Sequence, residues 1–246
     1  MPEKKLTLYG FFSLYLLTII LAFCSMVYEL LLAQTMAATL GNTILRYNTT
    51  IGLYLASLGI GSLIYPYGKN SFEILISRLF ATEIILSISG GIVPALSVLF
   101  DYHFQTSPGI IFLCNHLLVL WIGFLSGFEL PLLMDLADRC RAGLSRRILS
   151  FDYLGTLLGA ISFPLFLFPS FGIFLTAAIT GFINLLSAFF IYFYFNTEKS
   201  KKVIIFCMFL CMGFILFLSK EKVIKDFILK KYFLVGIKKE RLMYDF

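Results

Sequence analysis

The chain has 246 residues and a formal net charge of +6; 59% of its residues are hydrophobic and only 14% are charged. Its mean hydropathy of +0.91 lies far outside the range of soluble globular domains, so a soluble protein is excluded. We therefore interpret the chain as an integral membrane protein.

The hydrophobic residues fall into runs of about 17 to 27, which short polar or basic stretches separate. A hydrocarbon layer about 30 Å thick needs roughly 20 helical residues to cross it, and backbone groups inside must bond within the segment. We expect an all-α, polytopic, multi-pass membrane protein with about seven transmembrane helices. The expected spans are Leu8–Gln34, Leu45–Tyr65, Ile74–Leu99, Gly109–Leu133, Ile148–Pro169, Gly172–Phe195 and Val203–Leu218.

Lys and Arg residues of the short connections fall on one side of the expected bundle, at Lys4, Lys5, Lys69, Arg139, Arg141, Arg146, Arg147, Lys199, Lys201 and Lys202. Basic loops stay in the cytoplasm, so we predict a bacterial inner membrane protein with a cytoplasmic N-terminus. A seventh crossing would place the basic tail 220–246 outside. The last run is therefore either re-entrant or interfacial, or the earlier helices fix the topology, which we favour.

Ionisable residues inside apolar spans are costly and are usually paired or functional. Glu29 and Arg46 flank the short connection between the first two spans, so we expect them to pair. The candidate buried polar positions are Glu29, Arg46, Arg78, Glu83, Glu129 and Asp152, with the arginines as counter-charges. Arg78, Glu83, Glu129 and Asp152 lie at similar depths, so we expect them to form one network, which is either a polar site for a cation or, as we favour, a brace that fixes how the third, fourth and fifth spans pack. His116 stands apart, and we interpret it as an interior histidine rather than a proton carrier.

Small residues at four-residue spacing allow two helix backbones to approach closely. The candidate packing positions are Gly59, Gly61, Gly123, Gly127, Gly155 and Gly159. From this pattern we expect the fourth span, with its first pair of these glycines, to contact the fifth span, with the second pair.

Five cysteines, including Cys207 and Cys211 one helical turn apart, show no CxxC pair and no histidine at metal-ligand spacing. We read them as apolar packing residues; a redox pair is the alternative for the last two. We predict no metal, no cofactor and no catalytic residue.

Several blocks, taken in order, carry a resemblance to a known family: Tyr28–Leu30, Gly41–Asn42, Gly52–Ser62, Gly127–Leu133, Asp152–Ala160, Phe163–Pro164 and Pro169–Gly172. Together they resemble the membrane domain of bacterial membrane-bound spermidine synthase-like proteins, which are polyamine aminopropyltransferases. The resemblance implies a bundle of about seven helices that precedes a soluble domain. That domain has a methyltransferase-like Rossmann fold and binds decarboxylated S-adenosylmethionine and a polyamine.

The sequence contains no Gly-rich nucleotide loop after a strand and no soluble strand–helix alternation. We therefore divide it into a transmembrane bundle, 1–219, and a segment 220–246. This segment is either a basic amphipathic tail or the truncated lead-in to a missing catalytic domain, and Leu242–Phe246 resembles such a lead-in strand. We expect no aminopropyl transfer from this chain alone; a split enzyme, a repurposed membrane half and a truncated chain are the alternatives.

We therefore expect a non-catalytic membrane subunit or anchor that contacts lipid and docks a protein partner in a larger complex. The alternative is a small-molecule or polyamine transporter, because the first six spans are loosely similar to half of a major facilitator bundle. The acidic side chains would suit a polycation. Nucleic-acid binding is not expected, since topology accounts for the net charge.

Overall fold

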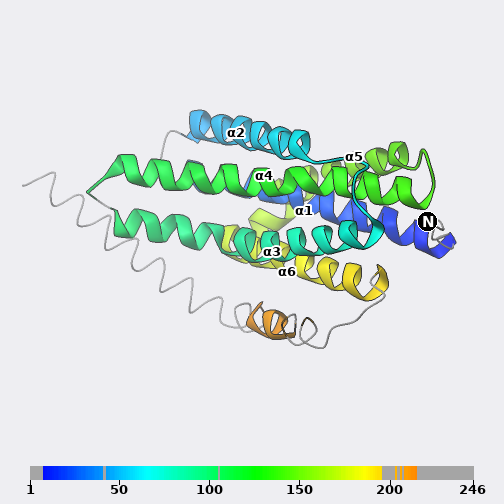
Figure 1. Ribbon diagram of the computed structural model, residues 1–246. Coiled ribbons are helices and arrows are strands. Elements are labelled where there is room, and N and C mark those ends of the chain that lie inside the picture. The colour runs from blue at the N-terminus through cyan, green and yellow to red at the C-terminus, as the bar shows by residue number, and fades with distance from the viewer. Residues whose placement is uncertain are drawn as a thin grey trace, which may run out of the picture.

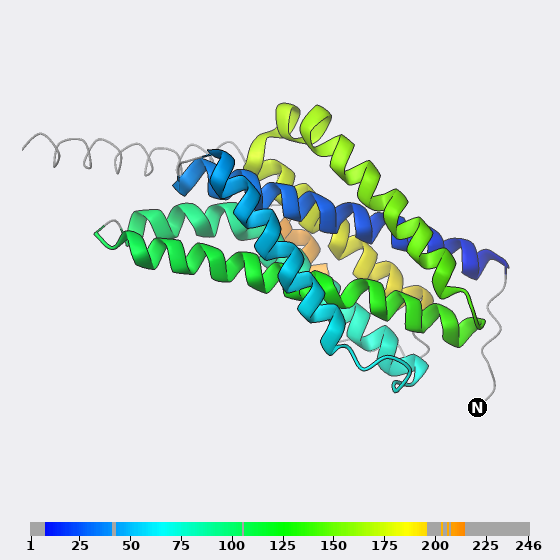
Figure 2. The same ribbon diagram turned by 90° about the horizontal axis from the view of Figure 1, so that it is seen from above.

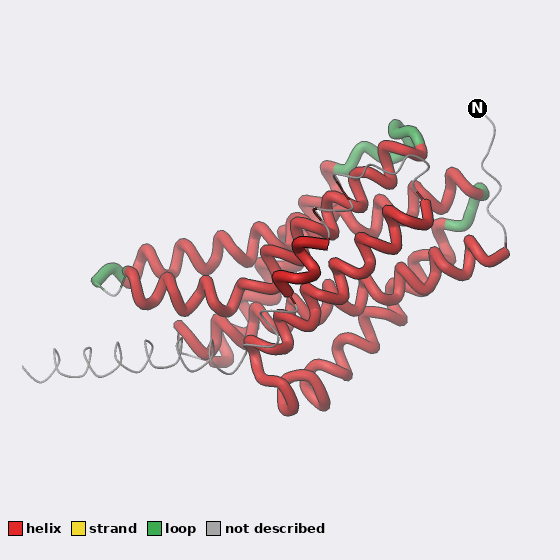
Figure 3. The backbone as a smooth tube through the Cα atoms, turned by 90° about the horizontal axis from the view of Figure 1, so that it is seen from below, coloured by secondary structure: helices red, strands yellow, loops and turns green. Residues whose placement is uncertain are grey.

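The computed structural model describes residues 8–40, 43–104, 106–195, 203, 206 and 208–214. Within these ranges the chain is helical apart from short turns, and no strand is formed, which confirms the all-α prediction. Figure 1 shows the elements: α1 (Leu8–Leu40), α2 (Thr43–Ile64), α3 (Phe72–His103), α4 (Pro108–Cys140), α5 (Ser145–Ser162), the π-helical turn η1 (Phe163–Leu167) and α6 (Phe168–Phe195). The described loops gather at the two ends of the bundle (Figure 3).

Four helical stretches of the described residues are long and apolar enough to cross a membrane: Gly10–Leu40, Phe72–His103, Pro108–Cys140 and Ser145–Phe195. Large apolar side chains also face outward, such as Leu63, which is 86% exposed, and Leu165, which is 76% exposed. A lipid environment accounts for such a surface, whereas water would not. Both observations support membrane association.

The expected count of seven helices is not confirmed, because six helices are defined in the described part of the chain. Helix α2 is not among the membrane-crossing stretches, since its first turns carry the polar run Arg46–Thr50. The last expected span, Val203–Leu218, lies mostly outside the described residues. Of that span, residues 208–214 are helical, and Phe214 packs against Phe182 of α6.

Helix α1 is the centre of the bundle and contacts every other helix from α2 to α6. The most extensive contacts pair α3 with α6, α1 with α5 and α2 with α4. Viewed from above, α2 and α5 lie on the same face of the bundle and are separated by α1 and α4 (Figure 2). Of these two outer helices, α2 packs mainly on α4 and α5 packs mainly on α1.

The predicted glycine positions make close contacts, but with other partners than expected. A Cβ at Gly127 or Gly61 would collide with the backbone of the facing helix in the α2–α4 pair, and Gly123 lies against Tyr54 of α2. Gly155 and Gly159 lie against α1 instead of α4. Helices α4 and α5 do contact each other, yet not through these glycines. Gly59 faces open space, so its assignment as a packing position is wrong.

The chain reverses direction between α5 and α6. Pro164 lies in the π-helical turn, where it leaves a backbone carbonyl without its usual amide donor. Gly172 then adopts φ 69° and ψ −174°, a conformation that disfavours any residue with a side chain. The long apolar stretch Ser145–Phe195 is therefore bent into two arms, which pack on α1 and on α3 respectively.

Candidate functional site

A cavity of about 280 Å³ lies between α2 and α5, and residues of α1 and α4 form its base. We call it the acidic groove. It is lined by Leu21, Ala22, Ser25, Met26, Glu29, Leu55, Leu58, Ser62, Ser126, Gly127, Glu129, Leu130, Pro131, Leu133, Leu149, Asp152, Tyr153 and Thr156. The groove exists because the small residues described above hold α2 against α4 and α5 against α1, which leaves the two outer helices apart (Figure 2).

Three of the predicted polar positions line this groove, each from a different helix: Glu29 from α1, Glu129 from α4 and Asp152 from α5. Glu129 is 5% exposed and Glu29 is 7% exposed, while Asp152 is half-buried. No Lys or Arg is among the lining residues. The oxygen Oε1 of Glu129 has no hydrogen-bond donor. Within the described residues, the groove therefore carries acidic groups without a compensating Lys or Arg.

Glu83 of α3 lies behind the groove. Its side chain is fully buried, and neither carboxyl oxygen has a hydrogen-bond donor. Glu129 interacts electrostatically with Glu83 and with Asp152, whereas Glu29 interacts with none of these three acids. Glu129 is therefore linked electrostatically to both Glu83 and Asp152, and Glu29 is not part of this set.

The two arginines expected as counter-charges, Arg46 and Arg78, do not pair with the acids of the groove. The one ion pair among the described residues joins Arg139 and Asp135. The guanidinium of Arg46 lies over the ring of Phe112, with its Cζ 4.9 Å from the ring centroid. The side chain of Arg78 is exposed, and its positive charge interacts electrostatically with Tyr65.

Helix geometry explains why these two predictions are wrong. Glu29 precedes the end of α1 by far more residues than Arg46 follows the start of α2, an offset of roughly 12 Å along the axes at 1.5 Å per residue. Arg78 and Glu83 are five residues apart on α3, a rotation of about 140°, so they face nearly opposite sides.

His116 is an interior residue whose Nδ1 lies 2.7 Å from the carbonyl oxygen of Phe112.

A second polar cluster at the end of α4 was not found by sequence reasoning. Asp135 Oδ2 accepts hydrogen bonds from the Tyr65 hydroxyl at 2.9 Å and from the Gly68 amide at 3.0 Å. Its Oδ1 lies 3.6 Å from Arg139 Nε, and Arg139 Nη2 donates to the Gly68 carbonyl at 2.6 Å. We call this set, with its neighbour Asp138, the loop latch, because it fixes the α2–α3 loop on α4.

Asp138 completes the loop latch. Its Oδ2 accepts from the Tyr67 hydroxyl at 2.7 Å, and its Oδ1 accepts from the Ser145 amide at the start of α5 at 3.0 Å. Burial raises the pKa of Tyr65 well above its usual value, and the hydrogen bond to Asp135 raises it further. The pKa of Tyr67 is raised in the same way, by burial and then by Asp138. The signal in the sequence was the spacing of Asp135, Asp138 and Arg139 in the last turns of α4.

Most of this chain is similar in sequence to known proteins. Polyamine aminopropyltransferase 2 of Ralstonia nicotianae is 33% identical over 188 residues, which cover 75% of this chain and 36% of that protein. The polyamine aminopropyltransferase of Leptospira interrogans is 33% identical over 174 residues, or 70% of this chain and 34% of that protein. This chain is related to the polyamine aminopropyltransferases. The resemblance inferred from the sequence blocks is thereby confirmed.

Polyamine aminopropyltransferase 1 of Streptomyces coelicolor is similar to the same extent, with 31% identity over 177 residues that cover 70% of this chain and 32% of that protein. The chain spans about a third of the length of the polyamine aminopropyltransferases it matches. No family model matches the chain. No solved structure matches it either, and the expected layout of half a major facilitator fold is not supported.

Proposed function

We propose that this chain is a non-catalytic, multi-pass anchor of the inner membrane that docks a protein partner in a polyamine-synthesising system. The observation that carries the proposal is the match to polyamine aminopropyltransferases, which covers 75% of this chain and 36% of the Ralstonia nicotianae protein. The described part of the chain consists of apolar helices, which supports a role within the membrane. We expect the partner to be a soluble polypeptide that supplies the aminopropyl transfer.

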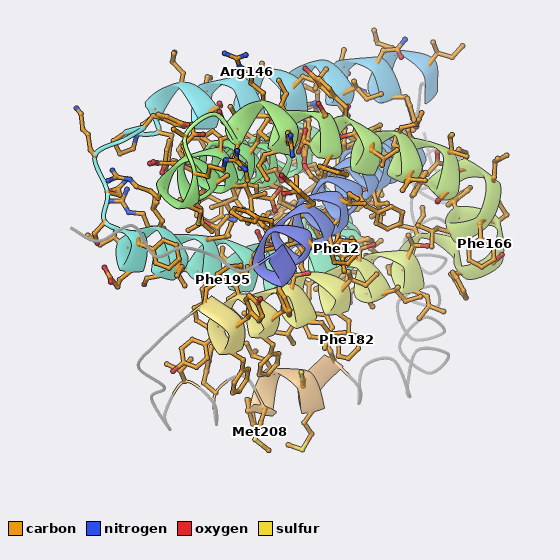
Figure 4. All side chains as sticks on the ribbon, turned by 90° about the vertical axis from the view of Figure 1, so that its right-hand side faces the viewer. Phe12, Arg146, Phe166, Phe182, Phe195 and Met208 are labelled. Carbon is orange, nitrogen blue, oxygen red and sulfur yellow. The ribbon has the colours of Figure 1, made fainter. Side chains whose placement is uncertain are left out.

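The proposed docking face is the end of the bundle where α4 ends and α5 begins. Five exposed basic side chains lie there: Lys69, Arg139, Arg141, Arg146 and Arg147. Arg146 lies at the outer edge of the bundle when this end faces the viewer (Figure 4). By the positive-inside rule this end is cytoplasmic, as is the N-terminus, which is the side where a soluble partner would be available. The loop latch holds Lys69 and Arg139 in position.

The test is purification of the tagged full chain from its native membranes in mild detergent after cross-linking, with mass spectrometry of the bound proteins. We expect a polypeptide with an aminopropyltransferase domain to be recovered with the wild type. The double substitution Arg146→Glu, Arg147→Glu should reduce its recovery about tenfold. Asn48→Glu, Thr49→Glu is the matched control, because both residues are exposed at the other end. Recovery of the chain alone, or equal loss in both variants, would contradict docking at this face.

Transport of a small molecule or a polyamine is the second candidate, and the acidic groove is the observation that favours it. Reconstituted liposomes distinguish the two functions. Uptake of labelled spermidine by the purified chain, with no partner present, would establish transport, whereas an anchor shows none.

A further inference from the structure

Two acids meet in the interior of the bundle, inside helices of membrane-spanning length. Glu83 of α3 is fully buried and Glu129 of α4 is 5% exposed, and a side-chain hydrogen bond joins the two carboxyl groups. An ionised carboxylate can only accept hydrogen bonds, so a bond between two carboxyl groups requires a proton on one of them. The contact therefore indicates that this pair carries a proton.

No cation of the described residues neutralises the pair. The one ion pair in that part of the chain joins Arg139 and Asp135, and neither Lys nor Arg lines the groove beside Glu129. Two ionised carboxylates in contact repel each other, and burial leaves little water to screen the repulsion. A single proton shared between the two groups limits the pair to one negative charge.

The side chains around the pair do not replace this proton. The titratable groups that interact with its two acids from the surrounding helices are all neutral or acidic: Cys24 and Tyr28 from α1, Tyr54 from α2 and Asp152 from α5. The Tyr28 hydroxyl donates to the Leu86 carbonyl at 3.3 Å, and the Tyr54 hydroxyl donates to Ser126 Oγ at 3.0 Å. Apart from the contact between the two acids, no donor reaches Oε1 of Glu129 or either oxygen of Glu83.

Asn184 of α6 lies at the level of Glu83. Helices α3 and α6 run in opposite directions, and Ser87 Oγ donates to the Gly181 carbonyl at 2.7 Å (Figure 1). Glu83, about one turn before Ser87, and Asn184, almost one turn after Gly181, are therefore level with each other. Asn184 is fully buried, and neither of its amide atoms has a hydrogen-bond partner. Buried polar groups without partners are rare and call for a functional explanation.

The acids become more exposed from Glu83 toward the groove. Glu129 interacts with Glu83 behind the groove and with Asp152, and both Glu129 and Asp152 line the groove. Asp152 is half-buried and follows the start of α5 at Ser145 by about seven residues, or roughly 10 Å at 1.5 Å per residue. The series Asp152, Glu129, Glu83 thus leads from near the basic end of the bundle into its interior.

We propose that Glu83 and Glu129 form a binding site for one exchangeable proton, which the two carboxyl groups share and which enters and leaves through the acidic groove by way of Asp152. Uptake forms one O–H bond on the pair and lowers its charge from two negative to one. Release breaks that bond and returns the proton to the Asp152 carboxylate and then to water. This site depends neither on the docking proposed above nor on transport of a small molecule.

The first test is infrared spectroscopy of the purified full chain at pH 7.5 in dodecyl maltoside, a detergent without a carbonyl group. A protonated carboxyl gives a C=O stretching band above the amide I band, and this band shifts to lower frequency in heavy water. We expect the double variant Glu83→Gln, Glu129→Gln to lose the intensity of one protonated carboxyl per chain. Glu73→Gln, at an exposed acid of α3 outside the groove, is the matched control and should lose none. Loss of none, or of two, in the double variant would overturn the proposal.

The second test addresses the route of the proton and leaves the pair intact. Transfer into heavy water gives the rate at which the band shifts. Thr156→Trp places a bulky side chain in the groove and should slow this exchange at least about tenfold, as should Asp152→Asn. Leu157→Trp is the matched control, because Leu157 lies outside the groove and is 54% exposed. Equal exchange rates in Thr156→Trp and Leu157→Trp would overturn entry through the groove.

A last arm separates a proton from a monovalent metal ion, which would neutralise the same pair. Within the described residues no three His, Cys, Asp or Glu side chains converge as metal ligands, so we expect the same band in sodium chloride and in choline chloride. Loss of the band in sodium chloride alone would show that the metal ion occupies the pair, and would overturn the proposal.

Discussion

Helix α4 carries two buried acids in contrasting surroundings, Glu129 in the acidic groove and Asp135 in the loop latch. Asp135 accepts two hydrogen bonds and lies beside Arg139, whereas Oε1 of Glu129 has no donor and its neighbours Glu83 and Asp152 are themselves acids. The protein thus supplies hydrogen-bond donors and a cation to the carboxylate of Asp135, whereas it leaves Oε1 of Glu129 without a donor. We expect from this difference that the loop latch stabilises the fold and that Glu129 contributes little to its stability.

The largest effect is expected from Asp135→Ala. The substitution leaves the Tyr65 hydroxyl and the Gly68 amide without their acceptor and removes the partner of Arg139. Unpaired buried donors and lost charge-assisted bonds each cost about 1–3 kcal/mol, so we expect a loss of about 3–4 kcal/mol in the free energy of unfolding. Chemical denaturation in detergent micelles measures it. A loss below about 1 kcal/mol would remove the contrast between latch and groove.

The next largest effect is expected from Gly127→Ala. The new methyl group would meet the backbone of α2 at Leu58 and Gly61, so α2 would have to move away from α4. Overpacking of this kind costs about 1–3 kcal/mol, and thermal unfolding in detergent measures the loss. Gly59→Ala is the matched control, because it faces open space and gains about 0.5–1 kcal/mol of helix preference. Equal melting temperatures for the two variants would contradict this packing.

A smaller effect is expected from Tyr65→Phe, which removes one hydrogen bond to Asp135 and should cost about 1–2 kcal/mol. The raised pKa of Tyr65 favours the neutral phenol in the folded state. Its contribution to stability is therefore complete below the unfolded pKa of about 10 and is lost as pH rises above that value. Melting temperatures at pH 8 and pH 11 measure it, and the wild type should lose more than Tyr65→Phe. An identical loss in both would refute the role of this hydroxyl.

The smallest change in stability is expected from Glu129→Gln. The substitution keeps the shape of the side chain and replaces a buried carboxyl whose Oε1 has no donor, so the free energy of unfolding should stay within about 1 kcal/mol of the wild-type value or increase. Chemical denaturation in detergent micelles measures it, and a loss of more than about 1 kcal/mol would mean that Glu129 is part of a structural brace.

The sequence was sufficient for the all-helical class and for the approximate positions of α1 to α6, although not for the count of seven, because uninterrupted apolar runs leave the backbone few alternatives. It was also sufficient for the acids of the groove, since charges inside such runs are conspicuous. It did not reveal which helices pair: the glycines of α4 meet α2, and those of α5 meet α1, although α4 and α5 are neighbours in the chain. Small-residue spacing predicts close approach without naming the partner.

The counter-charges and the loop latch show that the sequence also does not reveal which polar side chains meet. Arg46 and Arg78 were matched to acids by depth alone, which neglects the axial offset in one case and the helical rotation in the other. Asp135 and Asp138 lie at the end of a helix, where sequence reasoning assigns charges to solvent. Their hydrogen bonds depend on a loop that folds back more than sixty residues away in sequence.

The most direct test compares Asp135→Asn with Glu129→Gln, two neutralisations that keep the shape of the side chain on one helix, by thermal unfolding in the same detergent. The account predicts that Asp135→Asn lowers the melting temperature by several degrees, at roughly 2–4 °C per kcal/mol, while Glu129→Gln leaves it unchanged or raises it. A fall in Glu129→Gln as large as that in Asp135→Asn would contradict the account, because both acids would then serve the fold.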